Sequence, residues 1–456
     1  MKIDQSRRPL RLRPIAVTGA IVLSVGLMAG CSSSTNSSEA AGSTEATANA
    51  PAASAAATEA ADPCNLLTLL GISPEESLAG ETLNLGAVLP LSGGGEKAYG
   101  KSMTEGLNLA VEEIAASGGP TMNFEIKDNG TADPQKSVTA INELGTAGVP
   151  AILSSLVNAF GAMNEGVNKY QILALDGGGG TATWNKGAPY FYGTRAVSPD
   201  DSLAGLTQYL KATYPDKKTW SAVTWQLDPN LNESDKQATI KALDAAGLEF
   251  SGTYEYVPFG GQDFASAIAK IKKANADYVL VSIYGADPGV FANQAQAANL
   301  PGQLVGFEYT QGGNDASRGA WDKGWLFAQD YFNAANPSSD LGACFATKYK
   351  EKYGADPDFY AANYFENVLD LWELSREVKA AGGDYTKGAD MLAALEKDPT
   401  MVSVYGGEGA TAGTLTLDTT THSVAQRPIG VFELKDGTVT PKATFEPGGG
   451  NYQPVG

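Results

Sequence analysis

Histidine, cysteine and basic side chains are scarce in this sequence, and each scarcity narrows what the chain can do. The single histidine, His422, lies in a threonine-rich run near the carboxyl terminus, where a lone histidine is more often a solvent-exposed side chain than a catalyst. No G-x-S-x-G, H-E-x-x-H or G-x-x-x-x-G-K-[ST] motif occurs. We therefore predict that the chain is not an enzyme and that it takes no cofactor.

The sequence also has too few suitable ligands for a metal site. Residues 228–232, DPNLN, place oxygen ligands at the spacing of a calcium-binding loop. However, Glu233 stands where that loop needs glycine, and Thr239 stands where it needs glutamate. The three cysteines and the one histidine are not placed to make another site. We predict that no metal is bound.

The shortage of basic residues excludes nucleic acid as a partner. The chain has 32 Lys and Arg against 51 Asp and Glu, which gives a formal net charge of −19. Such an acidic surface repels nucleic acid and keeps a protein soluble. The 43% hydrophobic and 18% charged residues are typical of a globular protein, and 456 residues are too many for a single small core. Two folded lobes are the natural expectation.

The amino terminus differs from the rest of the chain. Basic residues between Lys2 and Arg13 precede an apolar run, Ile15–Ala29, that is shorter than the roughly 20 residues of a spanning helix. The run ends in LMAGC, which resembles a bacterial lipobox. We predict a signal peptide over residues 1–30 and lipidation of Cys31. Ser6-Arg7-Arg8 leaves both ordinary secretion and twin-arginine export open, with ordinary secretion favoured.

A tether and a short extension come next. Residues 31–61 consist mostly of Ser, Ala, Thr, Glu and Asn, so they cannot bury enough apolar surface to order themselves, and we predict a disordered tether. Residues 62–82 carry four leucines between Leu66 and Leu70 and form an N-terminal extension with a short helix. In an exported protein Cys64 and Cys344 either form a disulfide or remain two isolated thiols, and the sequence leaves both open.

The rest of the chain is organised around a strand, loop and helix unit over residues 83–119. The apolar run Leu83–Leu91 has the length of a buried parallel strand, and a glycine-rich loop follows it. Met103, Leu107, Ala110 and Ile114 then recur on one helical face before Gly118-Gly119 ends the helix. In an open α/β sheet the loop of such a unit lies at the carboxyl ends of the strands, where ligands bind.

Strands and helices alternate for more than two hundred residues after Leu83, which predicts an α/β fold of two doubly wound parallel-sheet lobes joined by several hinge segments. We expect Ser198-Pro199 to begin the first helix after the crossing between lobes. The predicted boundaries are 83–198 and 326–405 for lobe 1, and 199–325 and 406–450 for lobe 2.

Polar residues follow the predicted strands, and facing strand ends would bring them to one site. The candidate ligand-binding residues are Ser92, Tyr99, Asn158, Gly179, Gly180, Thr181, Asn230, Tyr284, Asp287 and Glu308. Backbone N–H groups and hydroxyls suit a ligand carboxylate, whereas Asp287 or Glu308 suits an ammonium. Simpler explanations stay open, because glycine runs are often plain turns, Tyr99 could be core packing, and both acids could be surface residues.

The body from about Leu83 to Thr440 resembles the type I periplasmic-type binding proteins of ABC importers, specifically the leucine/isoleucine/valine-binding family. The resemblance rests on residues 85–114, on DNGTADPQKSVTAINEL, on GQDFASAIAKIKKANADYVLVSIYG and on LVGFE at 304–308. It implies that Ser92 and Tyr99 contact the ligand, that residues 179–181 hold its carboxylate, and that Glu308 meets its ammonium. Asn158 and Asn230 stand where the family has other side chains.

The resemblance implies a lipid-anchored solute-binding protein outside the cytoplasmic membrane. Such a protein captures a small polar solute and delivers it to an ABC permease in the membrane. A branched-chain amino acid is the first candidate for that solute. We expect a monomer. The alternatives are a ligand sensor for amides, urea-like or other small solutes that is coupled to signalling, a tethered hydrolase that uses Asp and Glu, and a structural envelope protein.

Overall fold

The computed structural model describes residues 62–131, 133–155, 160–178, 188–196, 201–226, 229–405 and 412–455. The signal-peptide, tether and Cys31 predictions, and the helix start at Ser198-Pro199, fall outside these ranges. Within them, no helix is long and apolar enough to cross a membrane. The same residues contain no group of three or more His, Cys, Asp or Glu that could hold a metal ion.

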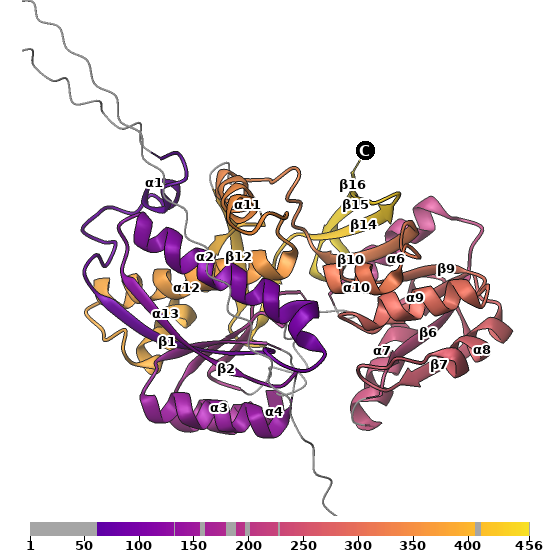
Figure 1. The fold of residues 1–456 in the computed structure, drawn as a ribbon, viewed down its shortest axis with the longest axis horizontal. Helices are drawn as coiled ribbons and strands as arrows, with labels where there is room; N and C mark the ends of the chain where they lie inside the picture. The colour runs from indigo at the N-terminus through magenta and orange to yellow at the C-terminus, as the bar shows by residue number, and fades with distance from the viewer. Residues whose placement is uncertain are drawn as a thin grey trace, which may run out of the picture. The chain divides into compact units, whose positions relative to one another are not determined.

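The first sheet is parallel throughout and has helices on both faces (Figure 1). Its order is β2-β1-β3-β4-β5, with β2 at Thr121–Asp128, β1 at Thr82–Leu89, β3 at Ala151–Ser154, β4 at Leu173–Asp176 and β5 at Phe191–Gly193. The side chains of β1 alternate between two clusters, because successive residues of a strand point to opposite faces. Leu85, Ala87 and Leu89 belong to one cluster and Val88 to the other.

Four long helices cover that sheet. On one face α2 (Lys101–Ala116) packs with α12 (Phe359–Ala380), and α3 (Pro134–Ala147) and α4 (Phe160–Tyr170) lie on the other (Figure 1). The predicted stripe Met103, Leu107, Ala110 and Ile114 is buried, as the helical spacing indicated. Asp133 caps α3, since its side chain accepts hydrogen bonds from the N–H groups of Gln135 and Lys136.

The close approach of α2 and α12 depends on one glycine. A Cβ on Gly106 would lie 2.1 Å from the carbonyl oxygen of Ala361 in α12. A short π-helix, η1 (Glu96–Gly100), leads from the predicted glycine loop into α2. The helices α11 (Asp340–Tyr353) and α13 (Gly388–Lys397) add buried residues to the same cluster. The first lobe therefore combines residues 82–193 with residues that follow Asp330.

The second sheet has a parallel centre and an antiparallel extension. Its order is β16-β15-β14-β10-β9-β8-β6-β7, built from β6 (Thr219–Trp225), β7 (Glu249–Val257), β8 (Tyr278–Ser282), β9 (Gln303–Phe307), β10 (Lys323–Asp330), β14 (Ile429–Lys435), β15 (Thr438–Glu446) and β16 (Gly450–Pro454). The pairs from β7 to β10 are parallel, whereas β14, β15 and β16 pair antiparallel. The all-parallel expectation therefore holds for the centre of this sheet only.

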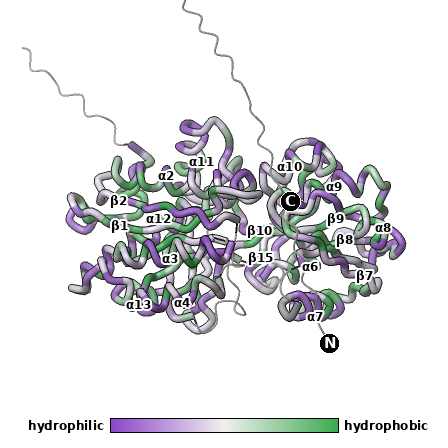
Figure 2. The backbone as a smooth tube through the Cα atoms, turned by 60° about the horizontal axis from the view of Figure 1, so that its bottom comes forward, coloured by the Kyte–Doolittle hydropathy of each residue, from purple (hydrophilic) through white to green (hydrophobic). Residues whose placement is uncertain are grey.

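Helices cover both faces of the second sheet as well. The helices α6 (Leu203–Thr213) and α7 (Pro229–Ala245) contribute to one buried cluster, and α8 (Ala265–Ala274) and α9 (Asp287–Ala297) contribute to the other. Figure 2 shows hydrophobic residues along β8 and β9 and hydrophilic ones on the exposed turns of α7 and α8. A shorter helix, α10 (Gln311–Ser317), follows β9.

A third, small sheet changes one predicted boundary. It consists of β11 (Thr400–Ser403), β12 (Gly413–Asp418) and β13 (Ser423–Gln426), paired antiparallel. We expected residues 406–450 to finish lobe 2, but Leu415, Leu417 and Val424 are buried in the cluster of the first lobe. The boundary near residue 325 also shifts, because β10 stays paired in the second sheet to Asp330. Local strand signals specify a strand but not the sheet that it joins.

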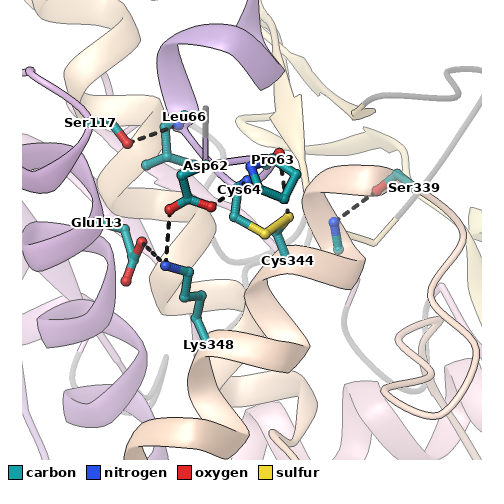
Figure 3. Close-up of a disulfide and its surroundings, with 10 residues drawn as sticks. Asp62, Pro63, Cys64, Leu66, Glu113, Ser117, Ser339, Cys344 and Lys348 are labelled. Atoms are coloured by element: carbon teal, nitrogen blue, oxygen red, sulfur yellow. Dashed lines mark hydrogen bonds and ion pairs between the residues drawn. A yellow bond between two sulfur atoms is a disulfide. The ribbon is translucent and has the colours of Figure 1, made fainter. Parts of the chain in front are cut away.

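The extension before β1 is fixed to the body at several points. A disulfide joins Cys64 to Cys344 of α11 across a sequence separation of 280 residues (Figure 3). Nearby, Lys348 lies between Asp62 and Glu113, and the N–H of Leu66 donates to the hydroxyl of Ser117 (Figure 3). The short predicted helix is α1 (Leu66–Leu70), in which Leu66 and Leu69 are buried. The extension is therefore part of the folded body.

Candidate functional site

Glu308, the acid that directly follows β9, lies at the centre of a buried polar cluster. Its side chain is 4% exposed, and its backbone has a φ of 67°. Residues other than glycine rarely adopt this left-handed conformation, and such strain concentrates at functional positions. The strain and the burial together identify Glu308 as a functional candidate.

Both carboxylate oxygens of Glu308 have donors from the first lobe or the crossing between lobes. Arg195 donates from Nη2 to Oε1, and the Tyr360 hydroxyl donates to Oε2 at 3.1 Å. Arg195 also donates from Nη1 to the Tyr360 oxygen at 3.0 Å. These three side chains form a closed ring of charge-assisted hydrogen bonds, which are stronger than neutral ones.

Tyr99 reaches the same cluster from η1. Its ring packs edge-on against Tyr360, with 5.4 Å between centroids, and the side chain is 3% exposed. Burial raises the pKa of Tyr99 well above its usual value, and the charges of Glu308 and Asp287 raise it further while Arg195 opposes them. The phenol therefore stays neutral and can donate a hydrogen bond.

Asp287 and Tyr284 follow β8 and lie beside an aromatic group of the second lobe. Oδ2 of Asp287 accepts from Trp225 Nε1 and from the N–H of Gly260, both at 2.9 Å. Burial raises the pKa of Asp287, whereas these donors lower it, and the net direction is upward. The Trp225 ring packs against Tyr284 at 5.3 Å and Phe259 at 4.4 Å. Both predicted residues are therefore near the strand ends, as expected.

Ser92 takes part in a separate network at the ends of β1 and β2. Its hydroxyl donates to Oδ2 of Asp128 at 2.5 Å and accepts from Nζ of Lys136 at 3.1 Å. Burial raises the pKa of Asp128, but Lys136, Ser92 and the backbone N–H groups of Gly130 and Leu91 together hold it well below its usual value. No hydrogen bond or ion pair among the described residues joins Ser92 to Glu308, so the role of Ser92 in ligand binding stays a prediction.

The remaining candidates fall where the structure is not described. Asn158, Gly179, Gly180 and Thr181 lie outside the described residues, and Asn230 lies in α7 with a side chain that is not described. The strand end that precedes residues 179–181 is well defined. Asp176 is buried and accepts from the hydroxyl of Ser154 at 2.8 Å and from the N–H of Gly178 at 2.7 Å.

The three segments that connect the lobes meet in a chain of buried charges. Arg195 follows β5, Asp330 ends β10, and Arg427 stands between β13 and β14. Oδ2 of Asp330 lies 3.6 Å from Arg195 Nε and 3.7 Å from Arg427 Nη1, and its Oδ1 accepts from the N–H of Ala196 at 3.1 Å. Arg427 also pairs with Glu366 of α12. The site residue Glu308 is thus linked to all three connections through side-chain contacts.

Sequence reasoning missed Arg195, Tyr360, Asp330 and Arg427. Each stands beside the end of a strand or at the start of a helix, but its contacts are with partners more than fifty residues away. The available signal was charge within apolar surroundings, as at Arg195 in YFYGTRAV and Arg427 in SVAQRPIG. Charged residues are almost never fully buried unless they are paired, so these positions indicated partners without identifying them.

His422 corrects another expectation. We predicted an exposed side chain, but His422 is 8% exposed and stacks on Tyr192 with 4.1 Å between ring centroids. Its Nδ1 lies 2.7 Å from the carbonyl oxygen of Ala188. The threonine-rich context suggested a turn on the surface, whereas the turn packs against the edge of the first sheet. The side chain of His422 therefore takes part in the packing at the edge of the first sheet.

The chain resembles known solute-binding proteins along most of its folded length. A family model described as periplasmic binding protein matches residues 82–438. The chain is 22% identical over 253 residues to the leucine-, isoleucine-, valine-, threonine- and alanine-binding protein of Pseudomonas aeruginosa, with 53% of this chain and 66% of that protein covered. It is 24% identical over 226 residues to the Leu/Ile/Val-binding protein of Escherichia coli, with 49% and 60% covered. The matches span about two thirds or less of these curated relatives.

Solved structures share the fold. A solute-binding protein from R. palustris in complex with benzoate superposes with a TM-score of 0.67 at 22% identity, covering 82% of this chain and 98% of that chain. The branched-chain amino acid transporter substrate-binding protein LivJ of Streptococcus pneumoniae, in complex with isoleucine, gives a TM-score of 0.65 at 21% identity, covering 80% of this chain and 100% of that chain. The family match spans the first sheet, the parallel centre of the second and the whole Glu308 cluster, and the chain therefore belongs to the periplasmic binding protein family.

Proposed function

We propose that this protein is an extracytoplasmic solute-binding lipoprotein of an ABC importer, which holds a small polar solute between its two lobes and delivers it to a membrane permease. The observation that carries the proposal is the cluster of Tyr99, Tyr360, Arg195 and Glu308. Tyr99 and Tyr360 come from the first lobe, Arg195 from a connection between lobes, and Glu308 from the second lobe. A solute that contacts both sides favours the closed arrangement, because ligands shift populations through differential contacts.

Family membership supports a location outside the cytoplasm, and the lipobox-like LMAGC supports a lipid anchor at Cys31. Amino-acid binding among the relatives named above makes an amino acid one candidate solute. The benzoate complex of a structural neighbour makes an aromatic carboxylate another. Family and fold alone therefore do not identify the solute.

The test is a thermal-shift screen of the mature chain, without residues 1–30, against amino acids, amides, carboxylates and small polyols. A ligand at one hundred times its Kd stabilises the folded state by about 2.7 kcal/mol. We expect at least one small solute to raise Tm and to be recovered unchanged after incubation. Recovery of an altered compound would favour the tethered hydrolase instead.

Transport and anchoring need their own measurements. Deleting the gene should abolish uptake of the bound solute by whole cells, whereas a sensor would leave uptake intact and change only a signalling response. Cys31→Ser should release the protein from the membrane fraction. Retention of that variant on membranes would contradict lipid anchoring at Cys31.

A further inference from the structure

The geometry points to a solute that carries no ammonium group, because Arg195 already occupies the acid that would bind one. We infer that Arg195 is a specificity-determining residue and that the protein binds an uncharged or carboxylate-bearing small molecule in preference to its α-amino counterpart. This inference rests on the proposed solute-binding function and adds the chemical class of the solute.

The first observation is that each carboxylate oxygen of Glu308 already accepts a hydrogen bond. Arg195 Nη2 occupies Oε1, and the Tyr360 hydroxyl occupies Oε2 at 3.1 Å. An incoming ammonium would be a second cation close to the Arg195 guanidinium. Because Arg195 and Glu308 are 3% and 4% exposed, bulk water cannot screen that repulsion.

The second observation is that Arg195 is fixed in place by contacts beyond Glu308. Its Nη1 donates to Tyr360 at 3.0 Å, and its Nε lies 3.6 Å from Asp330. The guanidinium carbon also lies 5.0 Å from the ring centroid of Phe359 and 5.2 Å from that of Tyr360, which are cation–π distances. An ammonium that displaced Arg195 from Glu308 would have to break this whole arrangement.

The third observation concerns Asp287, the other acid near the site. Its Oδ2 accepts two hydrogen bonds, from Trp225 Nε1 and from the N–H of Gly260. The Asp287 carboxylate therefore holds the Trp225 ring and the backbone at Gly260 in place. Among the described residues, both acids that could receive a ligand ammonium therefore already accept hydrogen bonds from the protein.

The surroundings instead suit an apolar body with a neutral or anionic head. Tyr99, Tyr360, Tyr284 and Trp225 provide aromatic surface near the strand ends. Burial keeps the hydroxyls of Tyr99 and Tyr284 neutral by raising the pKa of each, so both can donate hydrogen bonds. Hydroxyl donors suit carbonyl and carboxylate oxygens, whereas an ammonium group carries only donors and cannot accept from them.

The test compares molecules that differ only in the amino group. Isothermal titration calorimetry of the mature protein would use three such pairs: leucine with 4-methylpentanoate, phenylalanine with 3-phenylpropanoate, and leucinamide with 4-methylpentanamide. We expect the member without an amino group to bind at least tenfold more tightly in each pair that binds. An amino acid that binds more tightly than its deaminated counterpart would overturn the inference and leave the solute-binding function intact.

Variants of Arg195 make the test specific. Arg195→Met should leave Glu308 open to an ammonium and shift the preference toward the amino compound at least tenfold, whereas Arg195→Lys should keep the wild-type preference. Arg318→Met, which removes an exposed arginine, is the matched control and should change nothing. An unchanged preference in Arg195→Met would refute the role of Arg195.

An NMR measurement on the protein without solute tests whether Arg195 pairs with Glu308 in solution. In protein labelled with ¹⁵N-arginine, Arg195 should give guanidinium N–H signals that exchange slowly with water and disappear in Glu308→Gln. Arg318 supplies the freely exchanging reference within the same spectrum. If the Arg195 signals exchange as fast as those of Arg318, the pairing with Glu308 does not exist in solution and the inference fails.

Discussion

The disulfide between Cys64 and Cys344 gives the most direct test of how the body is held together. We would replace both cysteines by serine and, separately, reduce the unmodified protein. The structure joins an extension before β1 to α11, so the bond closes a loop of 280 residues in sequence. We expect both treatments to lower the free energy of unfolding while leaving the folded arrangement unchanged.

The magnitude follows from the loop length and from what else holds the extension. A cross-link over this separation removes about 5.6 kcal/mol of unfolded-chain entropy in the loop-closure relation, and measured losses on removing native disulfides are about 2–5 kcal/mol. Trp372 Nε1 donates to the carbonyl of Ser77 at 2.9 Å, and Arg376 Nε donates to that of Glu76 at 3.0 Å. These contacts keep the extension docked, so we expect a loss of about 3–5 kcal/mol.

The assay is urea denaturation followed by tryptophan fluorescence, with and without a thiol reductant. The expected result is a lower midpoint for the reduced wild type and for the double-serine variant, with no effect of reductant on that variant. A free energy of unfolding within about 0.5 kcal/mol of wild type would refute the reasoning, because it would mean that the cross-link constrains nothing in the unfolded chain.

Two further predictions concern packing and pH. Gly106→Ala should destabilise the fold by about 2–3 kcal/mol in the same denaturation assay, because its Cβ would meet the Ala361 oxygen. The control variant Gly161→Ala, whose Cβ would have nothing within 4 Å, should stabilise α4 by up to about 1 kcal/mol. Equal effects of the two substitutions would contradict the close contact between α2 and α12. Asp128 has a pKa below its usual value because of Lys136 and other donors, so its stabilisation is present above about pH 4 and is lost as the pH falls further. Asp128→Asn should therefore show a smaller loss of stability between pH 5 and pH 3 than wild type, and identical pH profiles would exclude this role.

Much of the fold could be predicted because local patterns report local structure. The apolar run of β1 and the stripe of α2 both appear where the sequence indicates them. Each depends on hydrophobic period within about fifteen residues. Membership of a sheet does not depend on such local patterns. The sheet and the core that β12 joins are decided by its partners β11 and β13.

The same contrast between local patterns and long-range contacts applies to the candidate site. The sequence by itself determined that Tyr99, Asp287 and Glu308 follow strands or their loops, because parallel strands place their carboxyl ends at one edge. Only the tertiary structure decided that Arg195, from the crossing after β5, pairs with Glu308 and that Asp330 lies between Arg195 and Arg427. Charge pairing across more than one hundred residues leaves no periodic trace in a sequence, because the energy of a buried pair depends on distance and burial in space and not on spacing along the chain.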